Sequence, residues 1–198
     1  RDWSVTGVQT CALPICQLRP IFARYPASVQ AAAADLFASL NADAARQNAR
    51  VDELLPTVSR GDVRRGQALF NSPRTACLLC HKVGYAGGLL GPDLTNIGRI
   101  RSERELLEAV MYPSATLVRG YEPFTVTTRN RDTHTGIIRR DSADELTLAI
   151  GPESEVTLAR TDIADVQPAT VSPMPPGMDV ILTPGELADL VAFLKSRH

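Results

Sequence analysis

Two cysteines and a histidine in the stretch TACLLCHKVG, residues 75–84, are the side chains in this sequence best suited to chemistry. Cys77 and Cys80 are separated by two residues and His81 follows directly, and this C-x-x-C-H pattern is typical of covalent c-type haem attachment. The two cysteines lie one helical turn apart, so both thiols share a face and can reach the two vinyl groups on one porphyrin edge. His81 can then place its imidazole beneath the iron. We therefore predict one covalently bound haem c per chain.

A zinc site and a thiol–disulfide redox pair are the other common uses of a C-x-x-C pair. Structural zinc normally takes four ligands, and the only other cysteines are Cys11 and Cys16. A thioredoxin-like pair would follow a strand in a βαβ unit, whereas the residues before Cys77, GQALFNSPRTA, favour helix and loop. Both alternatives stay open beside the haem prediction, as does a chance occurrence of the pattern.

The first residues, RDWSVTGVQTCALPIC, differ in character from the rest of the chain. VTGVQTCALPI resembles the translation of a common sequencing adapter, so we expect residues 1–16 to be an artefact that lies outside the fold. They lack the basic start and unbroken apolar run of a signal peptide, and bulky Ile15 stands where a lipoprotein cleavage site needs a small residue. On this interpretation the native amino terminus is missing, and Cys11 and Cys16 carry no function.

Composition limits the classes of function. The chain has 198 residues, of which 44% are apolar and 22% charged, with a formal net charge of -1. These values are those of an ordinary soluble globular protein of one or two domains, and they argue against nucleic-acid binding through bulk charge. No run approaches the ~18 apolar residues of a membrane span, so we expect none in this sequence.

Apolar periodicity predicts helices at both ends of the chain. Residues 17–58 read as short packed helices, with starts at Ser28 and Asn41 and a stop at Pro56, and we interpret them as the tail of a truncated upstream domain. A second unit, 59–198, begins with a helix that Asp62 can cap. Capping boxes predict two further helices; they pair Ser102 with Glu105 and Thr183 with Glu186.

Between about residues 121 and 167 the period changes from helical to alternating. FTVTTR, THTGIIRR, ELTLAI and EVTLAR are β-branched segments separated by turn residues, which predicts four or five short strands. We expect them to form a small antiparallel barrel or meander, inserted between the middle helix of the second unit and the loop before the last helix. Outside this segment, Gly66 and Phe70 on the first helix of the second unit should face Leu190, Phe193 and Leu194 on the last helix, with the glycine allowing a close crossing.

Four segments together carry a family resemblance: GDVRRGQALF, CLLCHKVG, GPDL and the terminal ELADLVAFLKS. They resemble a class I c-type cytochrome, and more narrowly the C-terminal haem-binding domain of large bacterial dehydrogenase-like, often membrane-associated, proteins. The resemblance covers about residues 18–198 and is weaker in the β segment. It implies a mainly α fold, in which a cytochrome c-like helical haem domain at 59–198 carries the β insertion at about 121–167 and follows short helices.

The resemblance also implies roles for particular residues. His81 would be the proximal iron ligand, and the backbone carbonyl of Pro92 in GPDL would accept a hydrogen bond from its other ring nitrogen. Leu94 and Ile97 would wall the haem face.

The sixth iron position needs a thioether or an imidazole, and the candidates in the second unit are Met111, Met174, Met178, His134 and His198. Met111 falls inside a predicted helix, where core packing explains it better. Met174 lies in SPMPPGM, a proline-stiffened loop before the last helix, which is how class I cytochromes present a thioether. We therefore favour Met174 as the second metal ligand, with Met178 as the fallback.

Iron ligated by His81 and Met174 has no open position, which predicts an electron-transfer domain and no catalytic residues. By resemblance, its partners would be a dehydrogenase-like domain upstream and a redox partner protein that carries electrons to respiration. Its location would be periplasmic or at the cell surface, because haem is attached to such motifs outside the bacterial cytoplasm. Two alternatives stay open: a five-coordinate haem for peroxidase chemistry or sensing, and a β interaction module in which the haem is secondary.

Overall fold

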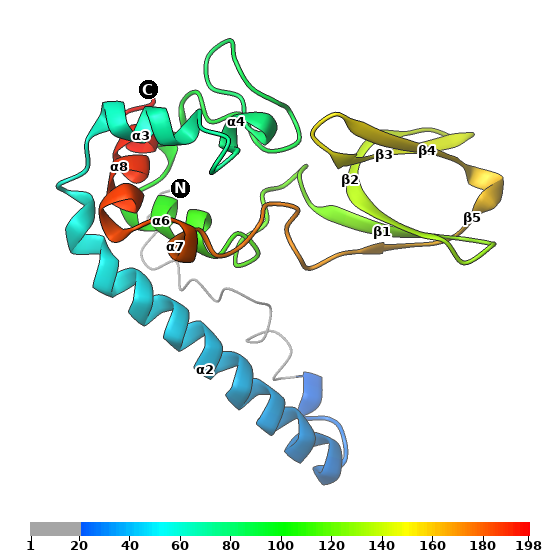
Figure 1. The fold of residues 1–198 in the computed structure, drawn as a ribbon. Coiled ribbons are helices and arrows are strands. Elements are labelled where there is room, and N and C mark those ends of the chain that lie inside the picture. The colour runs from blue at the N-terminus through cyan, green and yellow to red at the C-terminus, as the bar shows by residue number, and fades with distance from the viewer. Residues whose placement is uncertain (1–20) are drawn as a thin grey trace, which may run out of the picture. The chain divides into compact units, whose positions relative to one another are not determined.

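The computed structural model describes residues 21–198, so the artefact expected at residues 1–16 lies outside the described residues. The chain divides into two compact units at Asp52 and Glu53, within helix α2 (Ala27–Val58; Figure 1). This helix is continuous, whereas the sequence predicted short helices with a second start at Asn41. Its alanine-rich sequence has high helix propensity throughout, and Pro56 comes so near the end that few helical hydrogen bonds follow it.

The first unit is small. Ala33 and Phe37 of α2 form a buried cluster in it, and Phe22 and Leu40 pack against them. The rings of Phe22 and Phe37 meet edge to face, with their centroids 5.6 Å apart.

The helices of the second unit are α3 (Val63–Phe70), α4 (Cys77–Cys80), α5 (Ile97–Ile100), α6 (Glu103–Met111), α7 (Met178–Ile181) and α8 (Pro184–Lys195). The predicted caps are confirmed. The Asp62 carboxylate accepts a hydrogen bond from the Arg65 backbone N–H, and capping boxes begin α6 and α8. Each such cap satisfies backbone N–H groups that the helix itself leaves unpaired.

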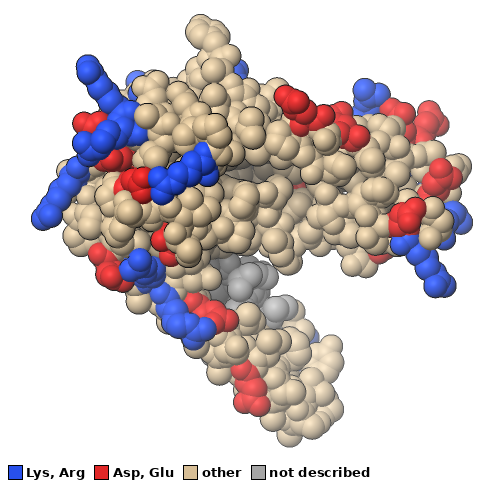
Figure 2. Space-filling model, in the orientation of Figure 1, with Lys and Arg blue, Asp and Glu red and all other residues tan. Residues whose placement is uncertain are grey.

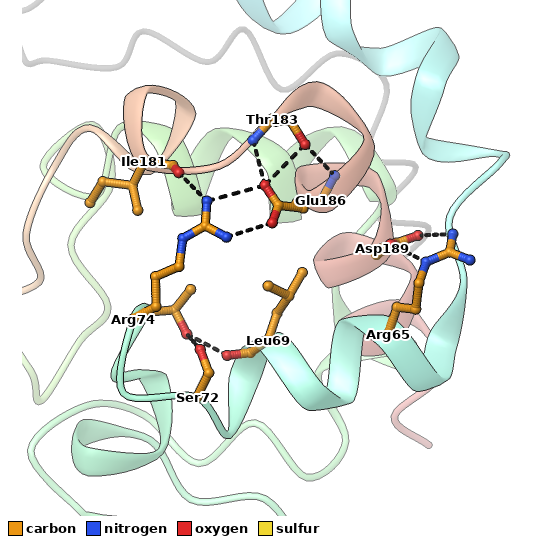
Figure 3. Close-up of polar contacts among 9 residues, drawn as sticks. Arg65, Leu69, Ser72, Arg74, Ile181, Thr183, Glu186 and Asp189 are labelled. Carbon is orange, nitrogen blue, oxygen red and sulfur yellow. Dashed lines mark hydrogen bonds and ion pairs between the residues drawn. The ribbon is translucent and has the colours of Figure 1, made fainter.

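Helices α3 and α8 cross closely, as predicted. A Cβ atom at Gly66 would lie 1.9 Å from the backbone oxygen of Asp189, so only glycine permits this approach. The rings of Phe70 and Phe193 pack with centroids 5.4 Å apart. The buried Asp189 carboxylate accepts two hydrogen bonds from the Arg65 guanidinium, at 2.7 and 2.8 Å (Figure 3). It accepts a third from the Asp62 N–H.

The strands form one antiparallel sheet in the order β4-β3-β2-β1-β5. Their bounds are β1 (Pro123–Thr128), β2 (Thr133–Asp141), β3 (Glu145–Gly151), β4 (Ser154–Ala159) and β5 (Ile163–Pro168), with a 3-10 turn, η1 (Arg160–Asp162), before β5. Because β1 pairs with β5, the sheet begins and ends side by side, and Figure 1 shows both connections returning to the helices.

Both faces of this sheet bury apolar side chains. On one face Val126, Leu146 and Leu148 form a core to which neighbouring strands add partly buried residues. On the other face Ile137 and Ala149, which are cross-strand partners, pack against Leu90 from outside the sheet. The sheet therefore has its own core and a second face that contacts the helical part of the unit.

The expected mainly α fold is wrong. The structure is 44% helical and 20% strand, with a five-stranded antiparallel sheet, which is not a cytochrome-like helical fold carrying a small insertion. The physical reason lies in the two buried faces. The strand segments predicted at 121–167 do form, but they build a sheet that packs against its neighbours as a layer, and the protein is better described as α+β.

Candidate functional site

Helix α4 presents the two cysteines of the motif on one turn. The chain enters it through Ala76, whose φ of 53° is left-handed, and leaves it at His81, which has extended backbone angles. The His81 N–H donates to the Cys77 carbonyl at 2.9 Å and closes the turn. The Cys77 and Cys80 side chains are half-buried, and both thiols are free. The spacing thus places both sulfur atoms on the same side of one turn, next to an imidazole.

The His81 ring is fixed by one hydrogen bond. Its Nδ1 lies 2.9 Å from the Pro92 carbonyl oxygen, and because a carbonyl can only accept, Nδ1 carries the proton. Nε2 makes no hydrogen bond with any residue between 21 and 198, so its lone pair is available to a metal. Burial lowers the pKa of His81, and the Pro92 carbonyl opposes this only in part. The ring is therefore neutral at neutral pH, which is the form that binds iron.

A glycine-rich loop, residues 84–91, lies directly on this segment. The Gly88 N–H donates to the Leu78 carbonyl at 2.9 Å, and the Gly91 N–H donates to the Cys80 carbonyl at 2.7 Å. A Cβ atom at Gly91 would come within 2.4 Å of Cε1 of His81, so a side chain there would displace the ring. The loop is thus shaped around the imidazole.

The surroundings of the two thiols shift their pKa values upward. Burial raises the pKa of Cys77, with a smaller opposing effect from Thr75, and burial also raises the pKa of Cys80. Reactive C-x-x-C pairs instead have a lowered thiol pKa. Within residues 21–198 no three His, Cys, Asp or Glu side chains are grouped to hold a metal ion, and structural zinc normally takes four such ligands.

Leu94 and Ile97, the predicted wall residues, are half-buried beyond Pro92. The Leu94 N–H donates to the Lys82 carbonyl at 2.8 Å, which ties this stretch to the residue after His81. Ile97 begins α5, and the Lys195 ammonium donates a hydrogen bond of 2.7 Å to the carbonyl of Gly98, the second residue of that helix. Sequence reasoning missed this contact, because Gly98 lies 97 positions before Lys195.

The candidates for the sixth position differ in burial. Met111 and Met178 are core residues with 0% and 6% of their surface exposed, whereas Met174 is half-buried in the loop before α7. His134 lies within β2, and His198 is exposed. The Met174 N–H donates to Ser172 Oγ, and the Ser172 N–H donates to Ser114 Oγ. These hydrogen bonds tie the Met174 loop to Ser114, just after α6. Among residues 21–198 the structure thus brings together His81, Pro92 and the glycine-rich loop, and no hydrogen bond joins Met174 to them.

Arg74, three residues before Cys77, anchors the start of the motif segment. Its guanidinium contacts both Glu186 carboxylate oxygens, at 2.5 and 3.2 Å, and the Ile181 carbonyl at 2.5 Å (Figure 3). This links the approach to α4 with α7 and with the first turn of α8. Sequence reasoning identified Glu186 as a cap but could not foresee its partner, which is 112 positions away.

The Arg74–Glu186 contact predicts a pH-dependent stability. Hydrogen bonds from Arg74, and then from Thr183, lower the pKa of Glu186 from 4.5 to about 2. A lowered carboxyl pKa stabilises the fold above the unfolded value, and this contribution is lost as pH falls through the folded value. We expect the melting temperature to fall between pH 4.5 and about 2, and to fall less in Arg74→Gln. Circular dichroism at stepped pH measures both.

The matched control is Arg140→Gln, which removes an exposed pair with Glu145. If Arg74→Gln lost as much stability over this pH range as the wild type and the control do, Arg74 would not be the group that lowers the Glu186 pKa.

The surface around the motif is apolar. Leu79 and Leu89 are 59% and 60% exposed, and Tyr85 is fully exposed. On the face drawn in Figure 2, the region around α4 and its loop is mostly uncharged, and Lys, Arg, Asp and Glu gather mainly toward the edges. No helix among residues 21–198 is long and apolar enough to cross a membrane.

Comparison with known proteins assigns no family. No family model matches the chain, and no curated protein matches it significantly. The function must therefore be argued from Cys77, Cys80, His81 and their surroundings.

Proposed function

We propose that this chain is an electron-transfer domain that holds one haem c through Cys77 and Cys80, with His81 and Met174 as axial ligands. The observation that supports this most strongly is the hydrogen bond from His81 Nδ1 to the Pro92 carbonyl, at 2.9 Å. It sets the tautomer and orientation of an imidazole next to two cysteines on one helical turn. Such an outer hydrogen bond is what a histidine needs in order to serve as a metal ligand.

The residues present fit this group. Each thiol adds across one vinyl group, with sulfur bonding one vinyl carbon and the thiol hydrogen going to the other, so nothing is released and no oxidant is needed. Protonated thiols, as the raised pKa values of Cys77 and Cys80 give, carry that hydrogen. Gly91 leaves room for the His81 ring, and the half-buried Leu94 and Ile97 would supply apolar surface to the haem face.

The bound haem would supply reversible one-electron exchange at its iron. His81 and Met174 would occupy both axial positions, so the domain passes electrons and is not itself an enzyme. We favour the half-buried, proline-flanked Met174 for this role over Met178, whose side chain is packed in the core. By resemblance, the electrons come from a dehydrogenase-like domain and go to a redox partner protein outside the cytoplasm.

The sixth ligand is tested by replacing each methionine with leucine, which has a similar volume. In protein matured with a c-type haem attachment system, Met174→Leu should abolish the weak red sulfur-to-iron absorption of the oxidised form. Its reduction potential should fall by on the order of 100 mV, because the axial ligand is a main determinant of potential. Met178→Leu, the matched control, should keep both properties.

Two outcomes would contradict this assignment. A wild type that lacks the red band and shows a high-spin, five-coordinate spectrum would replace electron transfer with peroxidase or sensing chemistry. Loss of the band in Met178→Leu, together with its retention in Met174→Leu, would move the ligand to Met178.

A further inference from the structure

The face of the sheet that carries Ile137 and Ala149 packs against the cysteine motif and its loop. Leu90, at the end of the glycine-rich loop, is 7% exposed and packs on Ile137 of β2 and Ala149 of β3, with Cys80 at the edge of the same cluster. Ile137 and Ala149 are 2% and 3% exposed. The contact thus joins the sheet to the loop that covers the haem-attachment turn.

A second contact joins the sheet to Leu89, the residue before Leu90 in the loop. The Arg139 guanidinium donates a hydrogen bond to the Leu89 carbonyl. Arg139 sits at an irregularity in β2, where the pairing with β3 passes from Ile138 directly to Arg140 and leaves one residue extra. Arg139 follows Ile137 by two residues, so regular strand alternation puts its side chain on the face that packs against Leu90. From that face the side chain reaches the loop.

The residues on either side of Leu89 and Leu90 in turn contact the cysteine motif. Leu89 and Leu90 lie between Gly88, whose N–H donates to Leu78, and Gly91, whose N–H donates to Cys80 and whose Cα lies against the His81 ring. Leu89 and Leu90, which contact the sheet, are therefore flanked on both sides by residues that contact the motif.

We propose that the sheet positions the haem-attachment segment, and that Arg139 is a positioning residue that holds residues 88–91 against Cys80 and His81. What this implies for the haem rests on the proposed function. The contact between Arg139 and the loop does not depend on the proposed function, because it lies within the polypeptide.

Backbone hydrogen exchange at Gly88 and Gly91 tests this in the full chain, measured both with and without haem. Arg139→Gln should raise exchange at these two amides roughly fivefold, because one hydrogen bond from a charged donor to the loop is lost. Arg139→Lys, which keeps a charged donor, should restore part of the protection. Arg140→Gln is the control, since the Arg140 side chain pairs with Glu145 within the sheet.

Hydrogen exchange tests the positioning role of Arg139, whereas haem attachment tests the proposed function, so the two proposals can fail separately. Unchanged protection at Gly88 and Gly91 in Arg139→Gln, with the β3 amides equally protected in all variants, would overturn the positioning role whether or not haem is present. A chain that never acquires haem would refute the proposed function and leave the exchange result to decide the role of Arg139. With haem bound, Arg139→Gln should also shift the reduction potential, and Arg140→Gln should not.

Discussion

The double variant Cys77→Ala/Cys80→Ala is expected to lose all haem stain from its band on a denaturing gel, whereas the wild type keeps it. After denaturation only covalent bonds can hold the group, and these two thiols are the ones that stand next to an imidazole with a free nitrogen. Expression together with a c-type maturation system and peroxidase staining for haem measure this. The effect is complete loss, the largest that the proposed function predicts.

The chain supplies its own control for this experiment. Cys11→Ala/Cys16→Ala removes the other two cysteines, which lie in the stretch that resembles a sequencing adapter, and should stain like the wild type. Each single variant, Cys77→Ala or Cys80→Ala, keeps one thiol and should stain more weakly. Equal staining of the double variant and the wild type would show that the haem is held elsewhere or not covalently.

Replacing Gly66 with alanine should lower the free energy of unfolding by about 3 kcal/mol, at the upper end of the usual cost of overpacking. The added Cβ would lie 1.9 Å from the Asp189 backbone oxygen and 2.8 Å from the Cβ of Phe193. A backbone atom cannot rotate away, so α3 and α8 must separate and disturb the packing of Phe70 on Phe193. Urea denaturation followed by circular dichroism gives the difference.

Gly185→Ala in the first turn of α8 is the matched control for Gly66→Ala. Apart from its chain neighbours and its own helix backbone, nothing in the structure lies within 4 Å of a Cβ at Gly185, so alanine should be neutral or stabilise by up to about 1 kcal/mol through helix propensity. Equal unfolding free energies for the two variants would mean that the α3–α8 crossing tolerates a wider separation than its geometry indicates.

Features set by short stretches of sequence could be predicted. The caps at Asp62, Ser102 and Thr183 depend on residues three positions apart, and the strands follow from local alternation. The contact between Gly66 and α8 was also predictable, because a glycine on the apolar face of a helix lets another backbone approach closely there. In the same way the C-x-x-C-H pattern located the candidate site without reference to the fold.

Features that depend on how segments approach one another were missed or mispredicted. The mainly α fold was wrong because alternation indicates that strands exist but not that they bury both faces of a sheet. The partners Arg74–Glu186 and Arg139–Leu89 join residues 112 and 50 positions apart, and no local pattern marks them. The Pro92 carbonyl was named only through a family resemblance, and the choice of Met174 stays a prediction.

The measurement that tests the central claim most directly is the intact mass of the matured wild-type chain under denaturing conditions. The account predicts one species, heavier than the polypeptide by the mass of a single haem, with the added mass on the peptide that contains residues 77–81. A mass equal to that of the bare polypeptide, from cells that mature other c-type cytochromes normally, would contradict it.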